Sequence, residues 1–160
     1  RRRMCIRGSN NVADETKYLL ETVALLEERL GIVFFQLPPN MKKDTERLKT
    51  FLDLLSEDTR TAFEFRHETW FDEEVFDLLR AKNCALVVSD TDEKPLTEII
   101  STAKWGYLRL RRTAYDGADL VAWLTRVRPQ KWKDAFAFFK HEDEGVGPRL
   151  AAQFIEMAQQ

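Results

Sequence analysis

Short apolar runs alternate along the chain with longer segments in which apolar residues recur every three or four positions. The short runs predict strands and the periodic segments predict helices. Strands are expected at 32–37, 61–66, 84–89, 105–110 and 135–139. Helices are expected at 15–30, 44–55, 72–81, 117–127 and 147–159, and residues 91–104 hold at most a short helix around Leu96–Ile100. This alternation, with strands that are apolar on both faces, is typical of a parallel sheet covered by helices.

Local signals predict where the first helices begin and end. Asp14 and Asp44 have the side chain of a helix N-cap, and Gly31 is expected to end the first helix. The apolar stripe of that first helix consists of Leu19, Val23, Leu26 and Leu30.

Two architectures fit a covered parallel sheet: an open doubly wound sheet and a (β/α)8 barrel. A doubly wound nucleotide-binding sheet needs a glycine-rich turn after an early strand, whereas the first strand here ends in Gln36-Leu37-Pro38-Pro39. A barrel needs eight strands over about 250 residues. Five strands in 160 residues predict one partial barrel domain, residues 1–160, which lacks its N-terminal strands. The start at Arg1-Arg2-Arg3, without an initiator methionine, agrees with a fragment, a processed product or an incomplete gene sequence.

Composition narrows the class of protein further. The chain is 44% hydrophobic and 32% charged, and its net charge of −2 provides no overall field that would select nucleic acid or an anionic membrane. No apolar run approaches the roughly 20 residues of a membrane span. Two cysteines, Cys5 and Cys84, match neither a zinc site nor a disulfide framework, and Cys84 is expected to be a buried thiol. We therefore expect a cytoplasmic protein.

Four runs carry a resemblance to a known family: Phe34-Phe35-Gln36-Leu37-Pro38-Pro39, Glu64-Phe65-Arg66-His67-Glu68-Thr69-Trp70, the segment 85–91, and the segment 107–111. Together they resemble domain-of-unknown-function family 72, the YecE-like proteins. The resemblance implies a TIM-type barrel and an absent N-terminal segment, and it implies no established reaction. Many members have Arg-x-His-Gly where this chain has Arg109-Leu110-Arg111-Arg112, so Arg111 stands in place of a histidine.

Polar residues end or follow each predicted strand, and in a barrel the C-terminal strand ends form the face that carries the site. Candidates for acid–base chemistry are Glu64, His67 and Asp90; candidates for ligand binding are Gln36, Arg66, Tyr107, Arg109, Arg111 and Lys140; Ser89 and His141 reach the same face. Alternation places Glu64 and Arg66 on one side of their strand, where they are expected to face Arg109 and Lys140. These cations suit a carboxylate or phosphate.

Each candidate also has a purely structural interpretation. Glu64 with Arg66 or Arg109 is equally consistent with a buried ion pair, and His67 with a cap on the loop that follows. Trp70 is expected to be packing, and the run His141-Glu142-Asp143-Glu144 to be a solvated loop rather than a metal site.

Three functions remain open. The first is a barrel that binds or turns over a small anionic ligand without a cofactor. The second is a metal-assisted phosphodiesterase or nucleic-acid-binding barrel, for which only His67 and His141 are available as imidazole ligands. The third is a non-catalytic fragment, which open sheet edges would make prone to self-association.

Overall fold

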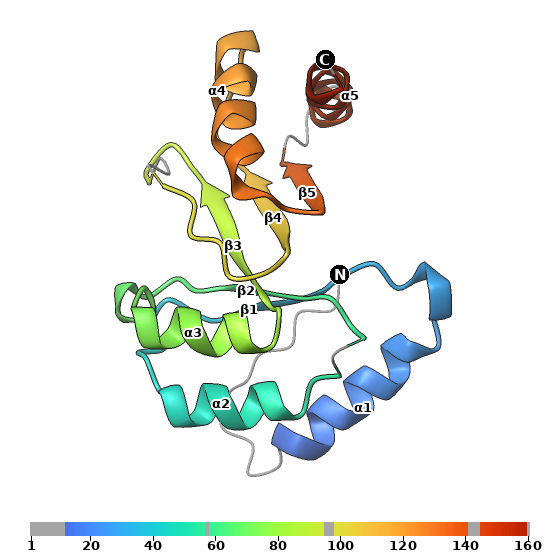
Figure 1. Cartoon of the computed structure of the whole chain (residues 1–160), viewed down its shortest axis with the longest axis vertical. Coiled ribbons are helices and arrows are strands. Elements are labelled where there is room, and N and C mark those ends of the chain that lie inside the picture. The colour runs from blue at the N-terminus through green and yellow to red at the C-terminus, as the bar shows by residue number, and fades with distance from the viewer. Residues whose placement is uncertain (1–11, 57, 95–97, 141–144, 160) are drawn as a thin grey trace. The chain divides into compact units, whose positions relative to one another are not determined.

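The computed structural model describes residues 12–56, 58–94, 98–140 and 145–159 (Figure 1). It contains one five-stranded parallel sheet whose strand order, β1-β2-β3-β4-β5, is the order of the chain. The strands are β1 Val33–Gln36, β2 Thr61–Glu64, β3 Ala85–Asp90, β4 Trp105–Leu110 and β5 Asp134–Phe139. All five predicted strands and the α/β class are thus confirmed.

The chain consists of two compact units, Arg1–Leu86 and Val87–Gln160. Strand β3 crosses the boundary between them. Its first two residues pair with β2, and the segment 87–90 pairs with β4.

In the first unit, β1 and β2 carry an aromatic core on the face that packs against α2 Thr45–Asp53. Phe35 and Phe63 lie side by side in the strand register, and the ring of Phe51 from α2 meets both edge-on, at centroid distances of 5.0 and 6.0 Å. This edge-to-face arrangement suits the quadrupoles of the rings. All four residues of β2 are buried, as expected of a strand covered on both faces.

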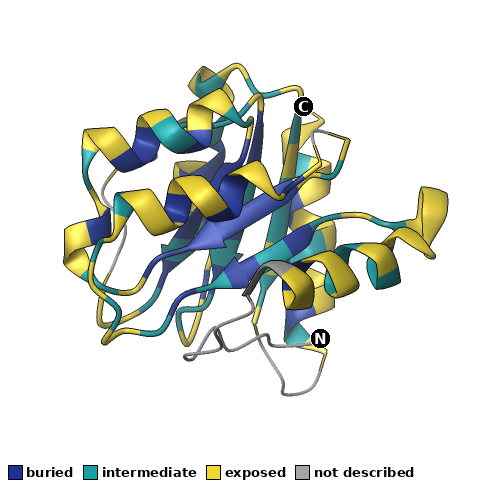
Figure 2. Ribbon diagram, turned by 90° about the horizontal axis from the view of Figure 1, so that it is seen from below, coloured by how far each residue is buried: buried dark blue, intermediate teal, exposed yellow. Residues whose placement is uncertain are grey.

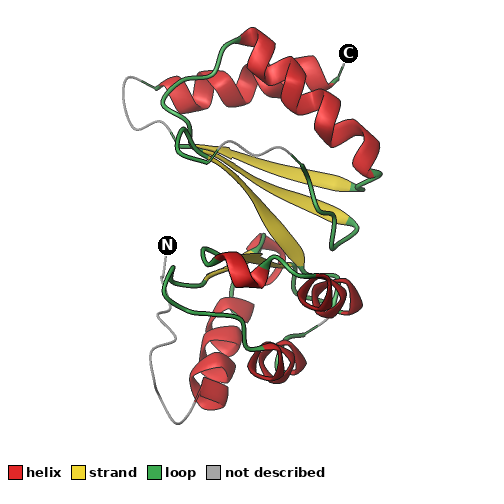
Figure 3. Ribbon diagram, turned by 90° about the vertical axis from the view of Figure 1, so that its left-hand side faces the viewer, coloured by secondary structure: helices red, strands yellow, loops and turns green. Residues whose placement is uncertain are grey.

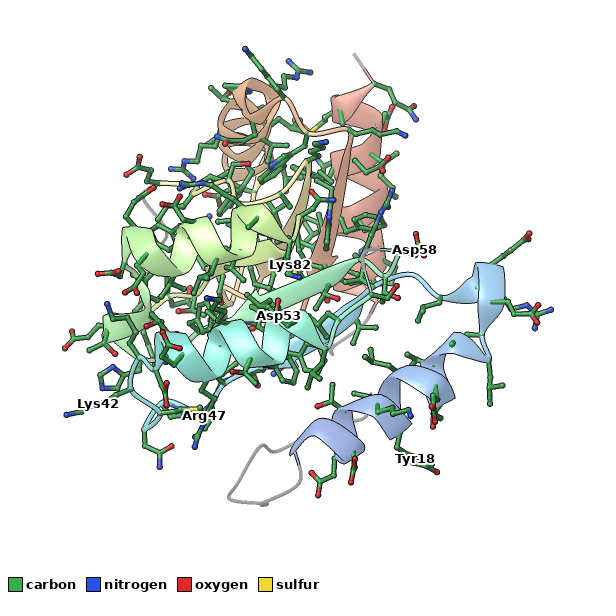
Figure 4. The ribbon with its side chains drawn as sticks, turned by 60° about the horizontal axis from the view of Figure 1, so that its bottom comes forward. Tyr18, Lys42, Arg47, Asp53, Asp58 and Lys82 are labelled. Carbon is green, nitrogen blue, oxygen red and sulfur yellow. The ribbon has the colours of Figure 1, made fainter. Side chains whose placement is uncertain are left out.

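Side-chain caps fix the starts of α2 and of α3 Glu73–Ala81. The carboxylate of Asp44 accepts a hydrogen bond from the backbone N–H of Arg47 at 3.0 Å, which confirms the predicted cap. The carboxylate of Asp72 accepts a hydrogen bond from the backbone N–H of Glu74 at 3.1 Å and so caps α3. An ion pair of 3.0 Å between Lys82, which follows α3, and Asp53, which ends α2, holds the other ends of these helices (Figure 4).

The first helix is shorter than predicted. Helix α1 spans Val12–Ala24 and is followed by a short 3₁₀ helix, η1 Glu27–Arg29, so it ends before Gly31 and Asp14 lies inside it. Glu27 has a positive φ of 47°, a conformation that an α-helix does not contain. Leu26, predicted for the apolar stripe, is 51% exposed in consequence.

In the second unit, α4 Gly117–Val127 and α5 Val146–Ala158 cover the same face of β3, β4 and β5 (Figure 3). The 3₁₀ helix η3 Arg128–Gln130 connects α4 to β5. The core on that face contains Val88, Leu108, Leu110, Leu120, Trp123, Leu124, Leu150 and Phe154. Helix α4 has the predicted bounds and starts at a capping box between Asp116 and Asp119. The short helix expected around 96–100 is absent from the described residues 98–100.

Burial differs between the inner and outer strands of the second unit. Five of the six residues of β3 are buried, whereas β5 contains half-buried and exposed residues, so the expectation of two covered faces fails for β5. Figure 2 shows the contrast between the buried strands and the exposed outer faces of the helices. None of the helices in the described ranges is long and apolar enough to cross a membrane.

Candidate functional site

In the first unit, the predicted pair of Glu64 and Arg66 is present at the C-terminal end of β2. The carboxylate of Glu64 is 3% exposed, and its Oε1 lies 3.5 Å from Nε of Arg66, whose side chain is 40% exposed. The register places Gln36 of β1 beside Glu64. A carboxylate taken out of water beside one half-exposed guanidinium fits both a structural ion pair and an anchored acid–base group.

His67 lies where the chain turns into the 3₁₀ helix η2 Glu68–Trp70 and caps it. Its Nδ1 accepts a hydrogen bond from the backbone N–H of Thr69 at 3.2 Å and lies 3.0 Å from the Thr69 hydroxyl. That hydroxyl accepts in turn from the backbone N–H of Lys43 at 2.8 Å. In this geometry Nδ1 is the acceptor, so the neutral ring carries its proton on Nε2. The loop-capping interpretation of His67 is therefore the one for which the contacts provide evidence.

Trp70 is a packing residue, as predicted. It is 1% exposed, its ring stacks on Phe65 with centroids 4.7 Å apart, and its Nε1–H donates to the carbonyl of Met41 at 2.7 Å. The indole thus ties the loop before α2 to the end of β2, and its faces are not available to a ligand.

In the second unit, the strand register sorts the candidates onto opposite faces of the sheet. Ser89 pairs with Arg109, and Arg109 pairs with Phe138, so these three side chains share a face. Their neighbours Val88, Leu108 and Leu110 belong to the core beneath α4 and α5. Ser89, Tyr107, Arg109, Arg111, Phe138 and Lys140 therefore lie on the face that the two helices leave uncovered, which we call the helix-free face of the second unit.

Contacts at the strand ends confirm this alternation. Nη2 of Arg111 donates to Oγ of Ser89 at 2.7 Å, so Arg111 returns to the side of Ser89 after the strand ends. The backbone N–H of Arg111 donates to the carbonyl of Asp90, and that of Lys140 donates to the carbonyl of Leu110, both at 2.9 Å. The ladder therefore continues beyond the strands and holds both cations close to the sheet.

Asp90 lies on the other face, among the core residues. It is 2% exposed, and its Oδ2 accepts from Nε of Arg112 at 2.8 Å and from the hydroxyl of Tyr115 at 2.9 Å. Nη2 of Arg112 also donates to Asp119 of α4 at 2.9 Å. These four residues form a network, the Asp90 network, that joins the ends of β3 and β4 to the start of α4. The predicted acid–base candidate Asp90 is thus separated by the sheet from Ser89 and Arg109.

The Asp90 network shifts the pKa values of its members. Burial, with the hydrogen bond to Asp90, raises the pKa of Tyr115 to about 12, although the N–H of Arg112 opposes this. Burial lowers the pKa of Arg112, but hydrogen bonds to Asp119, Tyr115 and Asp90 outweigh it and raise the pKa. The backbone N–H of Asp116 and the guanidinium of Arg112 lower the pKa of Asp119. The three shifts favour a protonated Tyr115, a charged Arg112 and an ionised Asp119.

Sequence reasoning missed two sets of residues here. The Asp90 network depends on contacts between residues far apart in the chain, but one signal for it existed, because Asp90 has the same strand parity as the apolar Val88. The aromatic pair of Tyr107 and Phe138, stacked with ring centroids 4.9 Å apart, was also not foreseen as a pair. The available signal was that each ring shares strand parity with a predicted ligand-binding cation, Tyr107 with Arg109 and Phe138 with Lys140.

The nine candidates are divided between the two units. Gln36, Glu64, Arg66 and His67 belong to the first unit, and Asp90, Tyr107, Arg109, Arg111 and Lys140 belong to the second. The run 141–144, including His141, lies outside the described residues. Within the described ranges, no group of three or more His, Cys, Asp or Glu side chains is arranged to hold a metal ion. The metal-assisted alternative thus gains no ligand set from this part of the chain.

Comparisons with known proteins agree on one family. Residues 2–160 match the family model described as "Protein of unknown function DUF72". A solved DUF72 family protein from Thermotoga maritima superimposes with a TM-score of 0.74 at 23% identity, covering 92% of this chain and 65% of that chain. Two structures of a DUF72 family protein from Enterococcus faecalis give TM-scores of 0.73 and 0.76 at 17% and 15% identity. They cover 91% and 96% of this chain and, in both cases, 68% of that chain.

The chain therefore spans 65% of the length of the Thermotoga protein. At these identities the solved structures establish a shared fold. No curated protein matches the sequence.

Proposed function

Because the chain belongs to the DUF72 family of proteins of unknown function, we propose that it supplies five βα units of a barrel that binds a small anionic ligand at the C-terminal strand ends. Two features support the barrel. A doubly wound sheet reverses its strand order at a switch point, whereas this order follows the chain from β1 to β5. In the second unit, α4 and α5 also cover the same face, as in a barrel with all its helices outside.

The observation that carries the ligand proposal is the set of cations on the helix-free face of the second unit. Arg109, Arg111 and Lys140 lie at or just beyond the C-terminal ends of β4 and β5, and Ser89 adds a hydroxyl beside Arg111. Guanidinium groups bind carboxylate and phosphate through paired N–H donors, so an anion is the ligand that this face suits.

We propose that the first unit, by itself, carries groups suited to proton transfer at the C-terminal end of β2. Glu64 is a buried carboxylate held by Arg66, and His67 presents Nε2–H from a ring fixed at Nδ1. A base and a donor with these fixed orientations are what general acid–base chemistry requires. Asp90 has no part in this proposal, because its carboxylate is bound within the Asp90 network.

Thermal unfolding in the presence of anions tests the proposal. Phosphate, pyrophosphate and citrate are titrated against chloride at matched ionic strength. A ligand at 100 times its Kd should stabilise the chain by about 2.7 kcal/mol. The variant Arg109→Gln should lose this stabilisation, and the control Lys42→Gln, which removes an exposed charge before α2 (Figure 4), should retain it. If no anion raises the melting temperature of the unaltered chain above the chloride reference, the proposal is wrong.

A further inference from the structure

Phe138 is an aromatic side chain left exposed in the middle of a cationic face. It is 44% exposed at the end of β5, whereas its neighbour Phe139 points to the other side and packs edge-on against Phe154 and Tyr115, at 5.8 and 5.7 Å. Strand β5 therefore presents one aromatic side chain to the core and the one before it to the helix-free face.

The ring is held in a defined position. Tyr107 of β4 stacks on Phe138 with the ring planes inclined by 27° and the centroids 4.9 Å apart. A side chain fixed by such a stack loses little further conformational freedom when a ligand covers it. The pair is therefore a rigid apolar surface on an otherwise polar strand end.

Two cationic residues are neighbours of Phe138, one on the adjacent strand and one further along the chain. Arg109 is the register partner of Phe138 across the sheet, and Lys140 is the next residue of the same parity along the chain. Strand spacing and residue rise place these positions about 5 and 7 Å from Phe138. These distances from the ring to the two cations match a ligand with a planar ring and a charged group on a short substituent.

Resting on the proposed anion site, we propose that its ligand is a phosphate ester of a planar ring system, as in an aryl phosphate or a nucleoside monophosphate. The ring stacks on Phe138 beside Tyr107, and the phosphate meets Arg109 and Lys140. Stacking of one ring on an aromatic side chain strengthens binding by about tenfold or more. The aromatic pair thus selects among anions, and the cations supply the charge complementarity common to all of them.

Calorimetric titration of the whole chain with methyl phosphate, phenyl phosphate and adenosine monophosphate tests this inference. The two ring-bearing esters should bind about tenfold more tightly than methyl phosphate. Preference for the nucleotide over phenyl phosphate would identify a nucleotide as the ligand, and equal affinity would identify the aryl group as sufficient; both support the inference. The variant Phe138→Leu keeps an apolar side chain and should lower the ratio of the phenyl phosphate affinity to the methyl phosphate affinity, both measured in the variant, from about ten to about one. The control Phe71→Leu alters another exposed aromatic residue, 51% exposed in the first unit, and should change neither.

The outcomes separate the two proposals. Equal affinity of the unaltered chain for methyl and phenyl phosphate overturns the ring-binding inference and leaves the anion site standing. No binding of any phosphate, together with no rise of the melting temperature in citrate, overturns both. The ligand comparison uses the unaltered protein, so it decides the question even if Phe138→Leu fails to fold.

Discussion

Replacing Tyr115 by phenylalanine removes one hydroxyl from the Asp90 network and changes little else. The hydroxyl donates to Oδ2 of Asp90 at 2.9 Å and accepts from the backbone N–H of Arg112 at 3.1 Å. The ring remains, with its edge-on contact to Phe139 and the guanidinium of Arg112 4.5 Å from its centroid. The substitution therefore isolates the two hydrogen bonds from the packing.

The expected loss follows from the burial of Asp90. A hydrogen bond to a charged group contributes about 1.5–3 kcal/mol, and Asp90, at 2% exposed, cannot replace the lost donor with bulk water. Arg112 still pairs with the carboxylate at 2.8 Å, so the charge is not left alone. We expect the free energy of unfolding to fall by about 2–3 kcal/mol, which is a large part of the 5–15 kcal/mol typical of a domain.

Urea unfolding, followed by tryptophan fluorescence and far-UV circular dichroism together, measures this loss. The midpoint should fall while the dependence on urea stays unchanged, because the surface exposed on unfolding is the same. Tyr18→Phe is the matched control: that hydroxyl belongs to a side chain 67% exposed on α1, and its removal should change stability by less than about 0.5 kcal/mol (Figure 4). In a double-mutant cycle with Asp90→Asn, the two effects should be coupled by more than about 0.5 kcal/mol. A loss no larger than that of the control would refute the role assigned to the hydroxyl.

Two further predictions concern alkaline pH and a close contact. Folding raises the pKa of Tyr115 from 10.0 to about 12, and burial raises that of Cys84 from 9.0 to about 11, so both groups are stabilised in their neutral form. Each raised pKa stabilises the folded protein by about 3 kcal/mol. This stabilisation is complete below the pKa of the unfolded state and is lost as the pH rises through the pKa of the folded state. The free energy of unfolding measured from pH 8 to 12 should therefore fall, and it should fall less in Tyr115→Phe. A Cβ at position 106 would lie 2.1 Å from the ring of Trp132, so Gly106→Ala should cost about 1–3 kcal/mol in urea unfolding. Gly31→Ala, where nothing lies within 4 Å, is the control, and equal losses for the two glycines would contradict the contact.

The sequence predicts those elements whose signals are local. The carboxylate of Asp44 begins α2 because a cap needs only the next turn of chain, and β4 has its predicted bounds because an apolar run between polar residues defines a strand. Helix α1 shows the limit of such signals: the apolar period continues to Leu30, but the chain leaves the helix at Ala24. Periodicity describes a surface that a helix would have, and tertiary contacts decide how much of that helix forms.

The candidate site also contains one part that local signals predict and one part that they do not. Glu64 and Arg66 were predictable as a pair, because alternation within one strand places them on one side. Asp90 was assigned by its position at a strand end, and its face is decided by partners 22 and 25 residues further along, Arg112 and Tyr115. Position along a strand is a local property, whereas the choice between a ligand and an internal partner depends on contacts distant in sequence.

The strand order has a consequence for how the protein is made. Each strand pairs with the strand made just before it, and Val33, for instance, meets Thr61 only one helical connection later. Ribosomes release about 5–20 residues per second, N-terminus first, and closing a loop of one βα unit costs little more entropy than closing a shorter one. A nascent chain can therefore add its strands in the order of synthesis, without holding an early strand unpaired for a distant partner. The edge at which the sheet grows during translation is always that of the newest strand, and the next unit to emerge covers it.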